Sequence, residues 1–289
     1  IILMTDPGYP VMGTHARYLQ GEVVLLPLTE ENKFLPDLKA IDKTILKKTK
    51  LLYLNYPNNP TAMTTDLEFY CQVVEFCQRH GIYILSDLAY AELYYDGNPP
   101  PSILQVPGGR EIAVEFTSMS KTYSMPGWRI GFAAGNTRLI AALARIKSYL
   151  DYGAFTPIQV AATAALNGSQ DCVDETRQLY RERRDVLIES MGAAGWQIPS
   201  PTATMFAWAP LPPVFKKLGS VEFSKLLLNE SKVAVAPGIA FGEHGDGHVR
   251  ISLVENRQRI RQAARNVKFL LSSSAQAIEN LEHRQAAAS

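Results

Sequence analysis

The strongest constraint on the fold is a regular alternation, in the first half of the chain, between short apolar segments and helical patterns. The apolar segments are rich in β-branched and aromatic residues, and they cover residues 1–5, 22–26, 50–55, 82–86, 112–117 and 129–134. Strands that alternate with helices pair in parallel and are covered by helices. The alternation therefore predicts an α/β fold with a mostly parallel sheet wrapped by helices.

The clearest helical pattern spans residues 66–80, between two of the expected strands. Thr65 and Glu68 stand three residues apart, as in a capping box, and Gly81 follows where a helix end favours glycine. We therefore expect a single helix here that connects two parallel strands.

The second half of the chain has a different pattern, which predicts a smaller α+β domain. A long charged helix is expected first, followed by short strands and two further helices, at residues 171–191, 205–208, 221–229, 233–236, 249–253 and 256–271. We expect residues 1–168 to form the large domain and residues 169–289 to form the interdomain helix and the small domain. The tail after Ser272 is low in apolar residues and is expected to fray.

Composition and charge exclude several classes of protein. Hydrophobic residues make up 46% of the chain and charged residues 20%, which is normal for a globular domain. The net charge of +1 is too small for a protein that binds nucleic acid by neutralising phosphates. No apolar run reaches the ~20 residues that span a bilayer. We therefore expect neither a nucleic-acid partner nor a membrane partner.

The cysteines and the first residue bear on where the protein acts. Cys71, Cys77 and Cys172 give an odd count, and the first two lie in one expected helix, so no disulfide framework is indicated. A reducing compartment fits best, and we expect a cytoplasmic location. Because the chain begins with Ile1 in an apparent strand, we expect the natural protein to begin upstream, where a targeting segment would not be visible.

Polar residues follow several of the expected strands at the point where each strand ends. Because the carboxyl ends of parallel strands meet at one edge of a sheet, these side chains are expected to lie close together. The set combines an asparagine, an acid, a tyrosine, a lysine and an arginine, namely Asn59, Asp87, Tyr90, Lys121 and Arg129.

Taken singly, these residues have ordinary structural explanations. The Asn-Asn-Pro-Thr segment is a turn sequence, Asp87 can cap a helix, Lys121 is typical of a surface charge and Arg129 of an ion pair. His244 and His248 stand four residues apart in a loop rich in glycine and aspartate, and we assign no metal site to them. Only the order and spacing of the polar motifs together point to a function.

That order and spacing resemble those of the class I/II aminotransferases, which are pyridoxal-phosphate enzymes of fold type I with the aspartate aminotransferase fold. The resemblance runs from Thr5 to about Leu271. It rests on six motifs, which are Asp-Pro-Gly-Tyr-Pro at residues 6–10, Asn-Pro-Thr at 59–61, Asp-Leu-Ala-Tyr at 87–90, Ser-Met-Ser-Lys at 118–121, Gly-Trp-Arg-Ile-Gly at 127–131 and Val-Arg-Ile-Ser at 249–252.

The resemblance implies pyridoxal phosphate as the cofactor and gives three residues a catalytic role. The cofactor needs an amine to form a Schiff base, so Lys121 is the expected carrier and, once displaced, the general base. Asp87 matches the carboxylate that keeps the ring nitrogen protonated, so that the ring can accept electrons. Tyr90, together with Asn59, matches the groups that hydrogen-bond the phenolic oxygen of the cofactor.

The resemblance also implies binding residues around this centre. Tyr9 matches the aromatic side chain that stacks on the cofactor ring, and Ser118 and Arg129 match ligands of its phosphate. Arg250 matches the arginine that holds the α-carboxylate of the substrate in a bidentate pair, and Asn59 is expected to contact the substrate as well.

The sequence departs from the family pattern at two places. Ala62 stands where many relatives have glycine after Asn-Pro-Thr, which we expect to alter only the turn. The 289 residues also lack the N-terminal arm, part of the small domain, the loop and helix that grip the phosphate, and a tyrosine lent across a dimer interface. We expect a homodimer, and the expected function refers to the intact protein.

The implied enzyme is a transaminase of amino acid metabolism that moves an amino group between an L-amino acid and a 2-oxo acid by a ping-pong Schiff-base mechanism. Residues 145–153 and 233–259 look most like the bacterial alanine (glutamate–pyruvate) aminotransferase branch, which implies alanine and glutamate with pyruvate and 2-oxoglutarate as substrates. The LL-diaminopimelate aminotransferase branch is close to it.

Two other classes remain open on the sequence. A fold type I carbon–sulfur lyase would use the same Lys121 and Asp87, but it would release pyruvate and ammonia without an oxo-acid acceptor. A non-catalytic, aminotransferase-like domain of a transcription regulator would follow a DNA-binding winged helix. The complete set of cofactor and carboxylate ligands makes the regulator domain the last of these alternatives, but it does not exclude the lyase.

Overall fold

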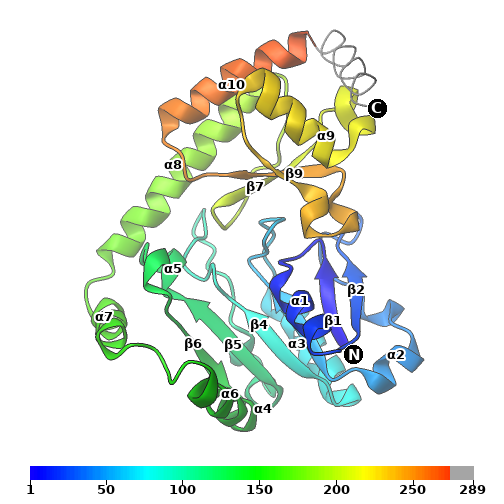
Figure 1. Cartoon of the computed structure of the whole chain (residues 1–289), viewed down its shortest axis with the longest axis vertical. Helices are drawn as coiled ribbons and strands as arrows, with labels where there is room; N and C mark the ends of the chain where they lie inside the picture. Colours follow the sequence, from blue (N-terminus) through cyan, green and yellow to red (C-terminus); the bar gives the residue numbers. More distant parts are fainter. Residues whose placement is uncertain (274–289) are drawn as a thin grey trace. The chain divides into compact units, whose positions relative to one another are not determined.

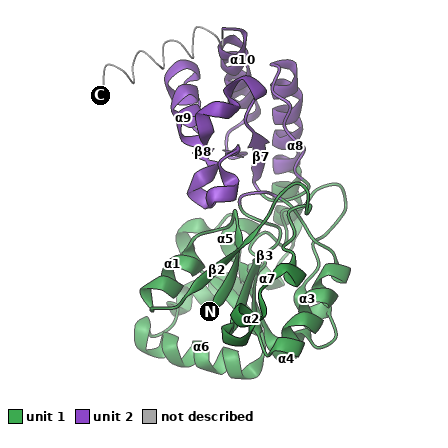
Figure 2. Ribbon diagram, turned by 90° about the vertical axis from the view of Figure 1, so that its right-hand side faces the viewer, with its two compact units in different colours: residues 1–59, 63–178, 202–204 green, residues 60–62, 179–201, 205–289 purple. Residues whose placement is uncertain are grey.

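The computed structural model describes residues 1–273, and these divide into two compact units (Figure 2). The first unit comprises residues 1–59, 63–178 and 202–204, and the second comprises residues 60–62, 179–201 and the chain from 205 onward. The sequence analysis placed the domain boundary at residue 168, and the two units divide within helix α8 (Asp171–Ala193). The expectation for the tail falls on residues that lie, after Ser273, outside the described part.

The first unit is built on a six-stranded sheet with the strand order β2-β1-β3-β4-β5-β6 (Figure 1). Strands β1 to β5 pair in parallel, and β6 pairs with β5 in the antiparallel sense. The prediction of a mostly parallel sheet is confirmed, and each strand begins and ends within two residues of its predicted bounds. The strands are β1 (Ile2–Asp6), β2 (Val23–Pro27), β3 (Leu51–Asn55), β4 (Tyr83–Asp87), β5 (Ala113–Ser118) and β6 (Gly131–Gly135).

Helices of the first unit accompany this sheet along the chain. They are α1 (Val11–Tyr18), α2 (Lys43–Lys48), α3 (Leu67–His80), α4 (Gly109–Ile112), α5 (Met119–Thr122), α6 (Thr137–Leu150) and α7 (Thr156–Asn167). Leu52, Leu54 and Ile84 of the central strands are fully buried in one apolar core with residues of α3, which include Val73 and Cys77. The continuous apolar run of β3 is therefore explained by burial on both faces, whereas in β4 every second residue is only partly buried.

Helix α3 corrects one detail of the sequence analysis. The capping residue is Asp66, whose carboxylate accepts a hydrogen bond from the backbone N–H of Phe69 at 2.8 Å, so the capping box at Thr65 and Glu68 was wrong. Aspartate caps a helix at least as well as threonine does, and it shifts the start of the helix by one residue. Gly81 ends α3 with a φ of +65°, as predicted.

A carboxylate is buried inside the first unit. Glu115 of β5 is 6% exposed, and it accepts hydrogen bonds from the hydroxyls of Ser86 and Ser102 at 3.1 and 2.6 Å and from the backbone N–H of Ile103 at 3.1 Å. A buried charge is tolerated when donors surround it, so this residue joins β4, β5 and the turn before α4.

The second unit contains an antiparallel sheet with the order β7-β9-β8, which forms a smaller α+β unit. Its elements are β7 (Phe206–Pro210), α9 (Gly219–Leu226), β8 (Ala236–Pro237), β9 (His248–Ser252) and α10 (Arg257–Ser272). The predicted strand at residues 233–236 is wrong in extent. Lys232 has a φ of +56°, and the N–H of Val233 bonds to the carbonyl of Leu227, so the chain is still turning where the strand was expected.

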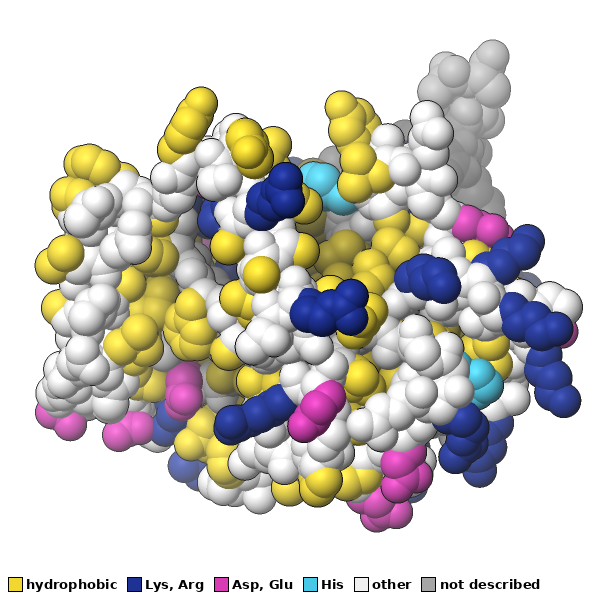
Figure 3. Space-filling view, turned by 90° about the horizontal axis from the view of Figure 1, so that it is seen from below, with side chains coloured by type: hydrophobic (Ala, Val, Ile, Leu, Met, Phe, Trp, Pro, Cys, Tyr) yellow, Lys and Arg dark blue, Asp and Glu magenta, His cyan; other side chains and the backbone are white. Residues whose placement is uncertain are grey.

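Helices α6 and α7 leave much apolar surface uncovered. Ala162 is the one buried residue among their described side chains, while Ile146, Tyr149 and Leu150 of α6 are more than half exposed. Figure 3 shows hydrophobic side chains gathered in patches on the face seen from below. None of the described helices combines the length and the apolar character that crossing a bilayer requires.

We predict that Glu115→Ala lowers the free energy of unfolding by about 3 kcal/mol, because three buried or half-buried donors lose their acceptor. Urea unfolding of the chain followed by circular dichroism measures the change. Glu111→Ala serves as the matched control, since Glu111 is exposed and its replacement should cost no more than about 0.5 kcal/mol. Equal costs for the two variants would contradict the prediction.

Candidate active site

The parallel strands of the first unit bring most of the predicted residues to one edge of the sheet. Tyr9 follows β1, Asn59 follows β3, Asp87 ends β4 with Tyr90 three residues later, and Ser118 ends β5. The strands pair in register, so that Asn55 lies opposite Asp87 and Asp87 opposite Phe116. The polar residues at these strand ends therefore share one edge, as the sequence predicts.

Asp87 is held by two donors at the end of β4. Its Oδ2 accepts a hydrogen bond from the hydroxyl of Tyr53 at 2.8 Å, and its Oδ1 accepts one from the backbone N–H of Ala89 at 3.1 Å. Burial raises the pKa of the Asp87 carboxyl, and these two hydrogen bonds and the nearby charge of Lys121 lower it by less. The residue is only half-buried, so a ligand can still reach it.

Tyr53 is a member of this site that the sequence analysis missed. Its side chain is 5% exposed, and burial raises the pKa of its hydroxyl far above the usual range, with further contributions from Asp87, Tyr9 and Tyr90. The phenol therefore remains a hydrogen-bond donor at any physiological pH. The strand period could have revealed it, because Tyr53 lies two residues before Asn55 and so on the same face of β3.

The structure thus brings Tyr9, Tyr90 and Lys121 within electrostatic reach of the Tyr53–Asp87 pair. Tyr90 is 4% exposed and Tyr9 is 42% exposed, whereas Lys121 is half-buried. A flat aromatic face, an amine and a carboxylate are therefore available in the same neighbourhood.

Asn55 connects the end of β4 to the Asn-Pro-Thr segment. Its Nδ2 donates to the carbonyl oxygen of Asp87 at 2.9 Å, and its Oδ1 accepts from the backbone N–H of Asn59 at 2.8 Å. Both asparagines are buried. One side chain therefore fixes the backbone of two predicted site residues, and this connection was also missed by the sequence analysis.

The turn after Asn-Pro-Thr has, at residue 62, a backbone conformation that favours glycine. Ala62 has a φ of +60°, in the left-handed region, which costs a residue with a Cβ atom of order 1 kcal/mol. The side chain is nevertheless buried, at 2% exposed. The departure from the family pattern therefore concerns the backbone of the turn.

Lys121 and Arg129 both lie in the connection between β5 and β6. Lys121 is on the short helix α5, whose first turn is capped by the Ser118 hydroxyl, which accepts from the N–H of Ser120 at 3.3 Å. Arg129 is exposed, has a φ of +50°, and donates from Nη1 to the carbonyl oxygen of Pro126 at 2.9 Å. Ser118 thus has a structural partner in addition to its predicted role.

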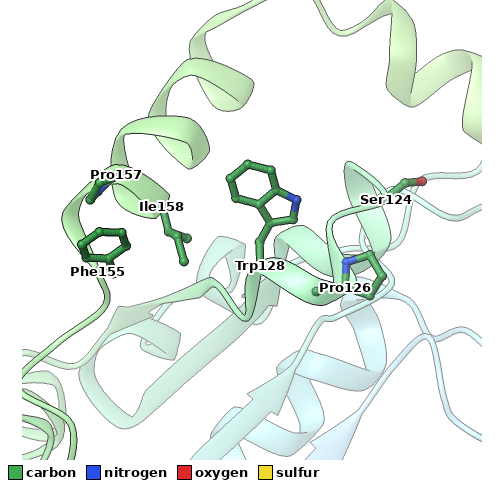
Figure 4. Close-up of a pocket in the computed structure, with 7 residues that line it drawn as sticks. Ser124, Pro126, Trp128, Phe155, Pro157 and Ile158 are labelled. Atoms are coloured by element: carbon green, nitrogen blue, oxygen red, sulfur yellow. The ribbon is translucent and has the colours of Figure 1, made fainter.

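An open pocket of about 510 Å³ adjoins this connection. Its walls come from the turn before Arg129 and from the start of α7, and Figure 4 shows the Trp128 indole projecting between these two segments. The lining residues are Ser124, Pro126, Gly127, Trp128, Phe155, Pro157 and Ile158. None of the predicted site residues lines it, so the hollow is distinct from the Asp87 site.

Arg250 belongs to the second unit, where aromatic rings orient it. Its guanidinium lies 4.0 Å from the ring centroid of Phe206 and 4.7 Å from that of Phe241, at the distance of cation–π contacts. Nearby, the ring of His248 stacks on Trp208 with centroids 5.0 Å apart. Within residues 1–273, no three His, Cys, Asp or Glu side chains are grouped to hold a metal ion.

We predict that Asn55→Ala lowers the free energy of unfolding by about 2–4 kcal/mol, because a partly buried carbonyl and a buried N–H both lose their partner. Denaturant titration of the chain measures the loss. The matched control is Asn98→Ala, since the side chain of Asn98 is exposed. A loss no larger than that of the control would show that Asn55 does not tie the two segments together.

Comparisons with known proteins identify the family of the chain. The aminotransferase class I and II family matches residues 1–267. The chain is 54% identical to AatC of Rhizobium meliloti (strain 1021) over 97% of its own length and 69% of that protein. It is 49% identical to the glutamate–pyruvate aminotransferase AlaC of Escherichia coli (strain K12) over 93% of its length and 65% of that protein. It therefore spans about two thirds of these relatives.

Solved structures agree with this assignment. BacF from Bacillus subtilis superposes with a TM-score of 0.90 at 36% identity, covering 93% of this chain and 71% of BacF. An aminotransferase from Staphylococcus aureus gives a TM-score of 0.87 at 34% identity, covering 93% and 70%. The chain belongs to the class I and II aminotransferases, a family of pyridoxal-phosphate-dependent enzymes of α/β fold.

Proposed function

We propose that the intact protein is an aminotransferase that moves an amino group between an L-amino acid and a 2-oxo acid, with Lys121 as the residue that carries pyridoxal phosphate. The observation that carries this proposal is the amine of Lys121 within electrostatic reach of the Asp87 carboxyl, whose oxygens accept hydrogen bonds from Tyr53 and from the N–H of Ala89. The family assignment supports it, since the similar proteins AlaC and the Staphylococcus aureus structure are both named aminotransferases.

The residues present fit this cofactor. Hydrogen-bond donors orient both carboxyl oxygens of Asp87, and the residue is partly accessible. Both properties suit a carboxylate that would pair with the protonated ring nitrogen of the cofactor. Tyr9 offers an exposed ring for stacking, and Arg129 offers an exposed fork of donors for a phosphate. When bound, pyridoxal phosphate supplies the electron sink that stabilises negative charge on the α-carbon of the substrate.

The side chains would divide the remaining work. Lys121, once released, takes the proton from the α-carbon of the substrate as the general base. Tyr90 and Asn59 donate hydrogen bonds to the phenolic oxygen of the cofactor, Asn59 also contacts the substrate, and Ser118 contributes to the phosphate site. Arg250 binds the α-carboxylate, and its contacts with Phe206 and Phe241 support this role because they hold the guanidinium in one orientation.

The proposed substrates are alanine and glutamate with pyruvate and 2-oxoglutarate. The similarity to AlaC, named a glutamate–pyruvate aminotransferase, supports this choice. LL-diaminopimelate is the second candidate, because the chain is 44% identical to LL-diaminopimelate aminotransferase 2 of Trichormus variabilis (strain ATCC 29413 / PCC 7937) over 92% of its length and 67% of that protein.

A homodimer and a cytoplasmic location complete the proposal. Cys71, Cys77 and Cys172 are free thiols in the structure, which suits a reducing compartment. The apolar residues exposed on α6 are of the kind that subunit contacts cover. Sedimentation of the intact protein as a fully active monomer would contradict the dimer, and secretion of the protein would contradict the location.

We predict that borohydride reduction of the full-length protein with pyridoxal phosphate attaches the pyridoxyl group to Lys121, because this amine is within electrostatic reach of Asp87. Peptide mass spectrometry locates the label. Lys147, which is paired with Asp151 on the surface of the same unit, is the internal control and should stay unlabelled. A label elsewhere, retained in Lys121→Ala, would refute the assignment.

We predict that Arg250→Gln raises the KM for alanine by about 10-fold to 100-fold, because a charge-assisted pair with the carboxylate is lost. Steady-state transamination measures it, with Arg259→Gln of the exposed face of α10 as the control. The same assay, run with LL-diaminopimelate and 2-oxoglutarate, separates the two substrate candidates. An unchanged KM would remove Arg250 from the substrate site, and release of ammonia without an acceptor would indicate a lyase.

A further inference from the structure

We propose that Tyr53 is a positioning residue for Asp87. The Tyr53 hydroxyl orients the Asp87 carboxylate toward the ring nitrogen of the cofactor and helps to keep that carboxylate ionised. The inference rests on the proposed function, in which Asp87 acts as the partner of that nitrogen. It concerns the neighbouring strand β3, which the motifs of the family do not include.

The first argument is geometric. The strand β3 holds the last residue of β4 at two points, since Asn55 binds the backbone carbonyl of Asp87 and Tyr53 binds its Oδ2. The backbone N–H of Ala89 donates a hydrogen bond to Oδ1 of Asp87. With both oxygens and the backbone engaged, rotation of the carboxylate plane would break a hydrogen bond, so one orientation is selected before any ligand arrives.

The second argument concerns charge. Burial acts against the ionised form of Asp87, and the strongest opposing influence comes from the Tyr53 hydrogen bond. Lys121 also opposes it, but its charge changes each time its amine accepts or gives up a proton as the general base. The Tyr53 phenol does not titrate in the physiological range, so it is a constant donor throughout a catalytic cycle.

The third argument comes from what surrounds the carboxyl. Four titratable groups influence the pKa values of the Tyr53–Asp87 pair or are influenced by it. One is the amine of Lys121 on α5, and the other three are the phenols of Tyr9 after β1, Tyr70 of α3 and Tyr90 after β4. Tyr53 itself donates a hydrogen bond to Oδ2 of Asp87 at 2.8 Å. Its replacement by phenylalanine removes that donor and keeps the ring that fills the core.

The test compares Tyr53→Phe with Tyr56→Phe in the full-length protein. Tyr56 is also buried, and its hydroxyl donates to the carbonyl oxygen of Phe34 at 2.7 Å, so both variants delete one buried hydroxyl and one hydrogen bond. The measurements are the dissociation constant of pyridoxal phosphate and the absorbance of the bound cofactor as a function of pH.

We expect Tyr53→Phe to weaken pyridoxal-phosphate binding about 10-fold, since a hydrogen bond to a charged group is lost. We also expect the acidic limb of the absorbance titration to move to higher pH. The sign follows from the donor: without the Tyr53 hydroxyl the pKa of Asp87 rises further, so its charge is lost at a higher pH. Tyr56→Phe should leave both quantities unchanged.

Three outcomes decide the matter. If Tyr53→Phe matches Tyr56→Phe in affinity and in titration, the inference is overturned while the proposed function stands. If the wild-type protein binds no pyridoxal phosphate, both fall. If Tyr53→Phe does not fold, the double variant with Asp87→Asn is compared by thermal unfolding. Recovery of folding supports the pairing, because the unpaired buried charge was the cause, and continued failure overturns it.

Discussion

The site depends on the hydrogen bonds that hold the half-buried carboxyl group of Asp87 at the end of β4. Burial works against the ionised form of Asp87, so the carboxylate needs donors that are fixed in place. The Tyr53 hydroxyl and the N–H of Ala89 provide these donors, and Asn55 donates a hydrogen bond to the backbone carbonyl of Asp87. The parallel pairing of β3 with β4 is what brings these groups together, so the chemistry of the site follows from the sheet.

Much of the fold was readable because burial on both faces leaves a simple pattern. The apolar runs of β1 to β6 predicted the large sheet, and the central strands β1 and β3 are mostly apolar because nearly all their residues are buried. The predictions that failed concern local competition. Asp66 caps α3 where Thr65 was predicted, and the left-handed conformation of Lys232 makes β8 begin later than predicted. The apolar pattern on which the predictions rested carries no information about either feature.

The candidate site was predictable to a different degree. Lys121, Asp87 and Arg129 belong to motifs with recognisable spacing, whereas Tyr53 and Asn55 lie inside an apolar strand where a polar atom looks like part of the core. Their partner is on another strand, 32 to 34 residues away, so the hydrogen bonds exist only after the register of β3 and β4 is known. Arg250 was found through its motif, but the aromatic rings around it were not.

The connection between β5 and β6 also has a consequence for the order of folding. Ser118 pairs with Gly131, where a Cβ atom would collide with the carbonyl oxygen of Thr117, so the two strands approach closely at the ends of a short link. Lys121 and Arg129 both lie in that link, whose contacts are local in the sequence and form with little loss of chain entropy. Asp87 reaches them only through non-local strand pairing. We therefore expect the link that carries the amine to form before Asp87 joins it, because Asp87 requires the pairing of β4 with β5.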